Sequence, residues 1–358
     1  MRKIVTFCLI VLTLASCQEK IVIEGTPENV FEVFWNTLNE RYVHFPDKDI
    51  DWDAVYHEYM PRFREAKTEG DLRELFGEII DMLRDTHLYI KPNHCKVGPC
   101  RLISFIPDYP LTIFESNIER YGFERIADIS PFRIYQHNSK GYVYISCYSF
   151  KIDYSAEWLL TTINGLNYSE GVIVDVSRNG GGNHTYYHLL SSLFVESGGT
   201  FYYRRFRNGI EHDSYTEPQK ESVYQYRDLP QDWLCFSKVP VVLITSRFNV
   251  SASTVFAYIV GELPNVLSIG HPSLGDGDRS RSVWLPNGWS MSYPFGKLFS
   301  RNGLDMHKPF VPDVELEWVA TRDTTAVIRA LEHLDSLNAY QWTNYWEIPS
   351  GGKKSYYK

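Results

Sequence analysis

The stretch "VPVVLITSRFNVSASTVFAYIV", residues 239–260, contains two apolar runs that meet at a short polar turn. The first run ends at Thr245 and is continuous, as expected of a strand buried on both faces of a sheet. The second run follows small hydroxyl residues, which are typical of a helix start. Residues 171–195, "GVIVDVSRNGGGNHTYYHLLSSLFV", repeat the order of strand, turn and helix. The two stretches therefore predict crossover units with parallel strands in a mixed α/β fold.

The sequence on either side predicts a helical unit before this core and further strands around it. Residues 26–83 hold three runs with apolar residues at helical spacing, which begin near Thr26, Trp52 and Thr68. From about residue 100, short runs such as "LTIFES", "RIYQH" and "YVYISCYSF" predict strands. We expect more strands at 265–270 and 281–295, and a last helix near 323–338.

The composition is that of an ordinary globular protein, with 44% hydrophobic and 22% charged residues among 358. The net charge is −8, and the chain has no run of Lys and Arg. Because a protein that follows a phosphate backbone needs a basic surface, we expect no nucleic-acid partner.

Residues 1–17, "MRKIVTFCLIVLTLASC", combine a basic start, an apolar block too short to span a bilayer, and small residues of the kind that precede a signal-peptidase cleavage site. A buried N-terminal strand is the alternative, but the basic start argues against it. The run Leu14-Ala15-Ser16-Cys17 resembles a bacterial lipobox, which implies cleavage before Cys17 and lipidation of that cysteine. The mature protein would then be lipid-anchored in a bacterial cell envelope, periplasmic or at the cell surface, with the outer membrane as the expected place.

The other cysteines offer a disulfide or a metal site. Cys95 and Cys100 flank the loop "KVGP" and could pair in an oxidising compartment. A metal site that includes His94 is the alternative, but no fourth ligand stands at a recognisable spacing.

Ser251 stands where the strand of the opening stretch gives way to its helix. A side chain there lies at the carboxyl end of a strand, and the amide of Ala252 points into the space where an oxyanion would develop. Ser251 could therefore be a nucleophile, or it could be only a helix cap, since Ser is a leading N-cap residue. Ser253 falls inside the helix and is the weaker candidate.

The run "DVSRNGGGN", residues 175–183, places three glycines between a buried strand and a helix. Glycines permit positive φ and close backbone approach, so their amides can hold an anion or an oxyanion. A phosphate-binding loop is the alternative, but no Gly-Lys-Ser/Thr follows.

His87, in "LRDTHLYI", stands where the third helix ends. A single histidine is more often structural than catalytic. A nucleophilic serine needs a general base, however, and histidine suits this role because its pKa lies near neutral.

Six motifs, taken in chain order, together resemble those of the S41 peptidases, the group of tail-specific, C-terminal processing and tricorn-type proteases. They are Asp85-Thr86-His87, "GVIVDVSRNGGGN", "VVLITSRFNVSAST", "GHPSLGDG", "LPNG" and "VPDVEL". The resemblance spans about residues 27–317 and implies a ClpP/crotonase-like β-α-β catalytic core with a β-rich subdomain, preceded by a helical subdomain. The implied organisation is a signal peptide at 1–17, a linker at 18–25, the helical subdomain at 26–95, the catalytic domain at 96–340 and a tail at 341–358.

The resemblance also assigns roles to residues. Ser251 falls on the family nucleophile. The amides of Ala252 and of the glycine run, Gly181 or its neighbour Gly180, fall on the oxyanion hole.

The base and the acid follow the tricorn-type pattern. Processing-type members use a lysine in a Gly-Lys-Gly turn, but that turn reads Gly275-Asp276-Gly277 here. Tricorn-type members use a histidine from the helical unit, which His87 matches, and an acid near the C-terminal Pro-Asp motif. Asp305 stands one residue out of register with that acid, and Asp276 is the alternative.

The leading hypothesis is a serine endopeptidase that cleaves peptides or proteins without metal or organic cofactor. The alternatives are a catalytically inactive protein of the same fold that binds a peptide or an apolar ligand, and an esterase with the same triad. Residues 91–140 are too few for the PDZ domain that many relatives carry, so substrate selection would fall to the cleft, to the small β-rich region or to another protein.

Overall fold

The computed structural model of the 358-residue chain describes residues 25–92, 118–195, 198–222, 236–317 and 324–339. The predicted signal peptide, Cys17, and the pair Cys95 and Cys100 lie outside these residues, as does the predicted strand at 111–116. Cys147 is described and is a buried, free thiol. Within the described ranges, no helix has both the length and the apolar character needed to cross a membrane.

Three helices form the N-terminal unit, as the sequence predicts. They are α1 (Pro27–Arg41), α2 (Trp52–Glu65) and α3 (Glu69–Leu83), with a short 3-10 turn, η1 (Phe45–Asp47), between the first two. Each helix begins at a side-chain cap, because Thr26, Asp51 and Thr68 each accept a backbone N–H from the first turn. Their apolar faces share one core with β1 (Tyr89–Lys91) and with residues 285–293 of a long hairpin.

The larger part of the fold is built on a seven-stranded sheet with the order β12-β9-β8-β5-β4-β3-β2. Strands β4, β5, β8, β9 and β12 run parallel, whereas β2, β3 and β4 form an antiparallel edge. The strands are β2 (Phe123–Ile129), β3 (Phe132–His137), β4 (Tyr142–Cys147), β5 (Gly171–Asp175), β8 (Val241–Thr245), β9 (Val266–Gly270) and β12 (Val314–Glu315), and β2 follows the 3-10 turn η2 (Ile118–Tyr121).

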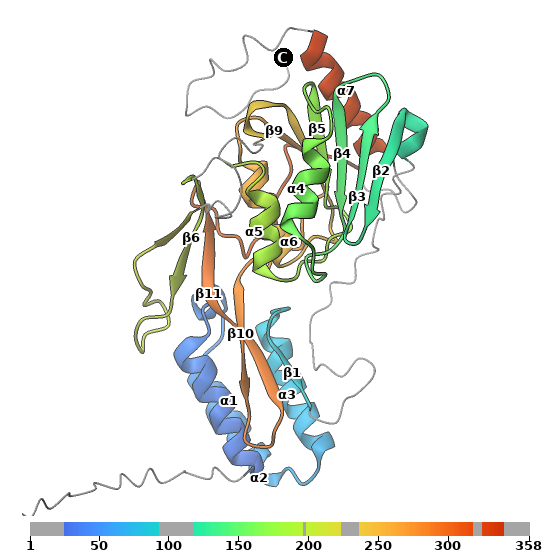
Figure 1. Cartoon of the computed structure of the whole chain (residues 1–358). Helices are drawn as coiled ribbons and strands as arrows, with labels where there is room; N and C mark the ends of the chain where they lie inside the picture. Colours follow the sequence, from blue (N-terminus) through green and yellow to red (C-terminus); the bar gives the residue numbers. More distant parts are fainter. Residues whose placement is uncertain (1–24, 93–117, 196–197, 223–235, 318–323, 340–358) are drawn as a thin grey trace, which may run out of the picture.

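Helices cover both faces of this sheet (Figure 1). One face packs against α4 (Ala156–Asn164), α5 (His184–Ser191) and α6 (Ala252–Gly261), and the other packs against α7 (Thr325–Ala339). Strands β5 and β8 are buried at every position, which explains their continuous apolar sequence. The predicted crossover units and the mixed α/β class are confirmed.

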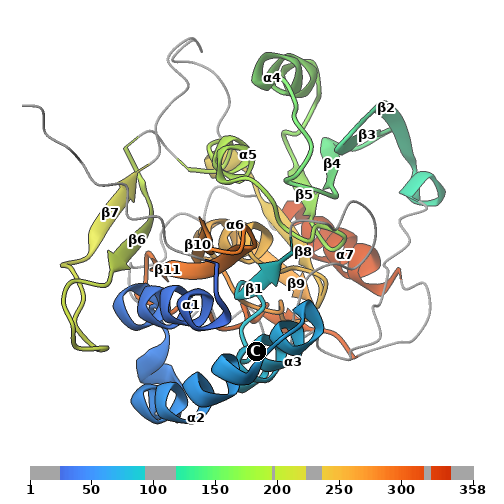
Figure 2. The same ribbon diagram turned by 90° about the horizontal axis from the view of Figure 1, so that it is seen from below.

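A second, antiparallel sheet links the two halves. Its order is β1-β11-β6-β7, and β10 pairs with the other edge of β11. Its strands are β6 (Thr200–Phe206), β7 (Gln219–Ser222), β10 (Arg279–Trp284) and the long β11 (Ser290–Ser300); the 3-10 turn η3 (Phe236–Lys238) precedes β8. The hairpin of β10 and β11 extends from the core to the helical unit, which lies in front of it when the molecule is seen from below (Figures 1 and 2). This hairpin therefore brings the turn after α3 close to the carboxyl ends of the parallel strands.

Candidate active site

Ser251 lies at the turn between β8 and α6. Its backbone has φ 59° and ψ −129°, a conformation that residues with a side chain rarely adopt. The hydroxyl does not cap the helix. Instead, its Oγ lies 3.0 Å from Nε2 of His87, a residue 164 positions earlier in the chain. The turn thus begins the helix and at the same time directs the serine side chain away from it.

The glycine turn after β5 packs directly against the serine turn. A Cβ on Gly181, whose φ is 87°, would lie 2.5 Å from the Val250 carbonyl oxygen and 3.0 Å from the Cβ of Ser251. A Cβ on Gly182 would lie 2.1 Å from the Phe150 carbonyl oxygen. Both contacts are too short for any side chain, so this close approach requires glycine.

Asn249 links the glycine turn to the serine turn through hydrogen bonds. Its side chain is fully buried, and Nδ2 donates to the carbonyl oxygens of Val176 and Asn179 and to the hydroxyl of Ser253. The hydroxyl of Ser253 therefore accepts a buried structural hydrogen bond from Asn249. Nothing in the sequence pattern marks Asn249 for this role.

The backbone amides around Ser251 differ in whether they are already bonded. The Gly181 N–H donates to Oδ1 of Asn179 at 2.9 Å. The N–H groups of Gly180 and Ala252 have no acceptor among the described residues. Ala252 and Gly180 are thus the two predicted donors whose N–H groups are not already bonded within the described part of the chain.

His87 belongs to a tight turn after α3. The helix ends at Arg84 in the left-handed conformation, and Oδ1 of Asp85 accepts the His87 N–H at 2.9 Å. The other oxygen of this buried carboxylate accepts the Tyr42 hydroxyl at 2.8 Å. Asp85 therefore fixes the backbone that presents the imidazole. The Nδ1 atom of His87 is buried, and no acceptor for it lies among the described residues.

Asp276 contacts the turn that holds His87. It has φ 53° and stands between Gly275 and Gly277, and its N–H donates to the His307 carbonyl oxygen at 2.9 Å. Its carboxylate accepts the hydroxyl hydrogen of Thr86, the residue before His87.

Burial and neighbouring charges act on the Asp276 carboxylate in opposite directions. Burial, followed by the negative charge of Asp85, raises its pKa above the ordinary value, while His307 and His87 oppose this rise. Asp276 and His87 are thus close enough to interact electrostatically.

Asp305 lies elsewhere. Its carboxylate accepts the His307 N–H at 3.0 Å and lies 3.7 Å from Nζ of Lys297. Within the described part of the chain, it makes no contact with His87. The sequence register suggests Asp305 as the first choice of acid, but its side chain is turned to its own loop and to the lysine.

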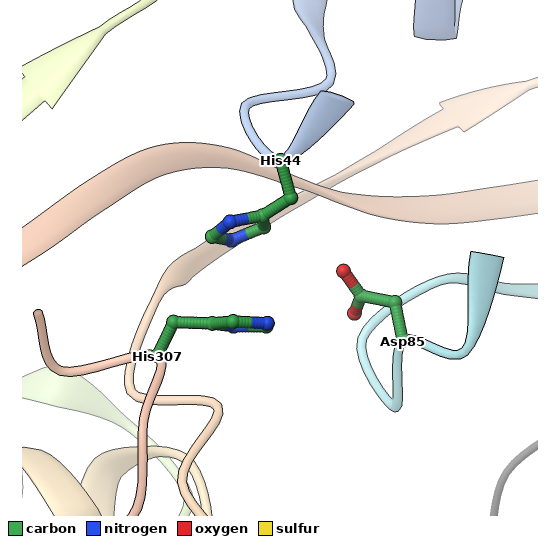
Figure 3. A group of neighbouring side chains, drawn as sticks. All are labelled: His44, Asp85 and His307. Atoms are coloured by element: carbon green, nitrogen blue, oxygen red, sulfur yellow. The ribbon is translucent and has the colours of Figure 1, made fainter. Parts of the chain in front are cut away.

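A cluster of mostly buried ionisable side chains lies next to Asp276. His44, Asp85 and His307 each offer a ligand atom within 4.8 Å of the others, and Figure 3 shows the two rings stacked with the carboxylate beside them. Both nitrogens of His44 are already engaged, Nε2 with Asp278 at 2.7 Å and Nδ1 with Asp47 at 3.1 Å. A metal ligand needs a free lone pair on a neutral imidazole. The cluster is therefore an ion-pair network and does not fit a metal centre.

The charges of this cluster follow from its contacts. Burial alone would lower the pKa of His44, but Asp278 and Asp47 outweigh it and raise the pKa to about 10. His44 is accordingly an imidazolium at neutral pH. Neither His44 nor His307 could be identified from the sequence, because a buried histidine between distant carboxylates leaves no local pattern.

Comparison with known families decides what kind of protein carries this site. The sequence model of Peptidase family S41 matches residues 141–316, and that of the Tricorn protease C1 domain matches residues 24–81. The chain belongs to peptidase family S41. It is accordingly a hydrolase of the serine peptidase class.

Solved structures of low sequence identity share the S41 fold. A candidate peptidase from Parabacteroides merdae has a TM-score of 0.72 at 23% identity, over 86% of this chain and 96% of that one. Mature CPAF complexed with lactacystin gives 0.60 at 11% identity, over 89% and 98%. A lipoprotein from Streptococcus agalactiae gives 0.59 at 15% identity, over 87% and 96%.

Proposed function

We propose that this S41 member is a serine endopeptidase in which Ser251 attacks the peptide carbonyl and His87 takes its proton. The observation that carries the proposal is the 3.0 Å contact between Ser251 Oγ and His87 Nε2. A nucleophile and a base within hydrogen-bond distance can transfer a proton during attack. The strained serine backbone supports the same role, because strain of this kind is commonly found at functional sites.

We propose Asp276 as the acid of the site. Proton transfer makes His87 an imidazolium, which a nearby carboxylate stabilises. Asp276 interacts electrostatically with His87 and is joined to the same turn by the hydroxyl of Thr86. Asp305 lacks both features and is paired with Lys297.

The oxyanion of the tetrahedral intermediate would be held by the amides of Ala252 and Gly180. Both N–H groups lack an acceptor among the described residues, whereas that of Gly181 is bonded to Asn179. One donor of this kind is typically worth about 3 kcal/mol of the activation barrier. The glycine turn and the helix start would therefore each supply one donor to the oxyanion.

We further propose that the enzyme is lipid-anchored in the cell envelope through Cys17. The basis is the run Leu14-Ala15-Ser16-Cys17 after a short apolar block, together with the likeness to a bacterial lipoprotein. Growth with an alkyne-bearing fatty acid tests this. The wild-type protein should incorporate the label and Cys17→Ala should not; equal labelling of both would contradict the proposal.

A fluorophosphonate probe tests the catalytic proposal. It should form an adduct that mass spectrometry maps to Ser251, and both Ser251→Ala and His87→Ala should abolish it while circular dichroism shows folded proteins. Labelling that persists in both variants would refute the assignment.

Hydrolysis of an unfolded protein separates the peptidase from the other candidates. The wild type should cleave an unstructured, fluorescently quenched protein, and Ser251→Ala should not. Cleavage of p-nitrophenyl esters alone would indicate an esterase. An unlabelled wild type that binds a peptide would indicate the inactive binder.

A further inference from the structure

We propose that His307 is a positioning residue of this site, which holds the Asp276 carboxylate in place and is itself held by Asp278 and His44. The inference rests on the proposed function, because it concerns a group that acts on His87 through Asp276. It assigns a role to a side chain that lies away from the reacting atoms.

The contacts of His307 place it between two carboxylates. Its Nδ1 lies 2.8 Å from Oδ2 of Asp278 and 3.2 Å from Oδ1 of Asp276. The carbonyl oxygen of the same residue accepts the Asp276 N–H at 2.9 Å. His307 thus binds Asp276 twice, once through the backbone and once through charge.

Asp278 anchors the ring from behind. It is completely buried in its side chain, and it accepts the Leu298 N–H at 3.1 Å in addition to its contacts with His307 and His44. The ring of His44 stacks on that of His307, with centroids 3.8 Å apart and planes inclined by 24° (Figure 3). The ring of His307 therefore has little freedom to leave the carboxylate of Asp276.

The network continues to the surface of the helical unit. Nδ1 of His44 lies 3.1 Å from Asp47, and Asp47 lies 2.6 Å from Nζ of Lys297 on β11. Two imidazoles and one ammonium group thus alternate with three carboxylates. Because the members come from the helical unit, the hairpin and the loops of the core, the network also fixes how these parts meet.

The charges around His307 explain why Asp276 needs it. The ionisable groups that face His307 are Asp276 and Asp278 from the loop before β10, His44 from the turn before η1, Asp85 from the turn after α3, and Asp305 from its own loop.

Among these groups, Asp85 and burial both favour the protonated form of Asp276, and His307 favours the ionised form. A buried carboxylate without a cationic partner becomes neutral, and a neutral Asp276 could not stabilise the His87 imidazolium. Burial and the neighbouring charge of His44 lower the pKa of His307, but the Asp278 and Asp276 carboxylates together outweigh them and raise it, so the ring can carry the charge that Asp276 needs.

The first test is the pH profile of fluorophosphonate labelling in His307→Gln. We expect the pH of half-maximal labelling to rise by about one unit relative to the wild type, so that labelling is lost on the acid side and recovers as the pH rises. His212→Gln is the matched control, because His212 is a half-buried histidine that stacks on Phe45 and bonds to Asn39 without touching Asp276. A pH profile for His307→Gln that matches the wild type, or that shifts equally in the control, would overturn the proposal.

The second test does not depend on activity. The imidazole of His307 is titrated by NMR in the full-length wild type and in Asp276→Asn. Removing the Asp276 charge should lower the pKa of His307, and an unchanged titration would overturn the pairing. Because this measurement needs no turnover, it decides the inference even where the probe fails to label the wild type.

Discussion

Replacing Gly181 with alanine tests whether the close contact of the two turns sets the position of Ser251. A methyl group at this position would lie 2.5 Å from the Val250 carbonyl oxygen, 3.0 Å from the Ser251 Cβ and 3.1 Å from the Ala252 nitrogen. An ordinary carbon-to-oxygen contact is about 3.3 Å, so the serine turn must retreat by roughly 0.8 Å. This displacement moves both the proposed nucleophile and one proposed oxyanion donor.

The expected loss of reactivity follows from that displacement. A misplacement of about 1 Å at a reacting group can cost about 100-fold in rate. The fluorophosphonate labelling rate of Gly181→Ala should therefore fall about 100-fold. The free energy of unfolding should fall by roughly 2–5 kcal/mol, which combines about 1–2 for the left-handed backbone with about 1–3 for overpacking.

Gly303→Ala is the matched control. Gly303 has φ 82°, close to the 87° of Gly181, but nothing lies within 4 Å of its Cβ position. This variant should lose only the backbone cost of about 1–2 kcal/mol and should be labelled at the wild-type rate. Equal labelling of the two variants, measured on folded protein, would refute the argument that the glycine contact positions Ser251.

Two further predictions concern stability. Ser251→Gly should be more stable than Ser251→Ala by about 1 kcal/mol in thermal unfolding, because only glycine accepts φ 59° and ψ −129° without strain; an alanine variant of equal or greater stability would contradict this. His44 has a pKa raised from 6.5 when unfolded to about 10 in the fold, so its stabilisation is complete below about pH 6.5 and is lost as the pH rises through about 10. The free energy of unfolding of the wild type should therefore fall between about pH 7 and pH 10, and His44→Gln should show a shallower fall; parallel curves would argue against a charged His44.

The sequence predicts those parts of the fold in which the local pattern of apolar residues shows which faces are buried. Strands β5 and β8 are continuous apolar runs because they are covered on both faces, and the helices of the N-terminal unit carry caps and apolar spacing that can be read locally. Ser251 could be singled out in the same way, from its place between a buried strand and a helix.

The rest of the site depends on contacts that no local pattern contains. Adjacent amides of a turn point in different directions, so the sequence could not distinguish Gly180 from Gly181. The direction of the Asp305 side chain depends on its bond to the His307 N–H, and that of Asp276 on a positive φ between two glycines. The partners of His44 lie 3 and 234 positions away, and only the folded chain brings them together.

One comparison tests the proposed triad of Ser251, His87 and Asp276 most directly. The fluorophosphonate labelling rates of Asp276→Asn and Asp305→Asn are measured side by side at neutral pH. We expect Asp276→Asn to lose about 100-fold or more, because the His87 imidazolium loses its carboxylate. We expect Asp305→Asn to stay within about threefold of the wild type, because an asparagine oxygen can still accept the His307 N–H and the lost charge pairs with Lys297 at 3.7 Å rather than with His87. A collapse of labelling in Asp305→Asn, with Asp276→Asn near the wild-type rate, would contradict the proposed triad.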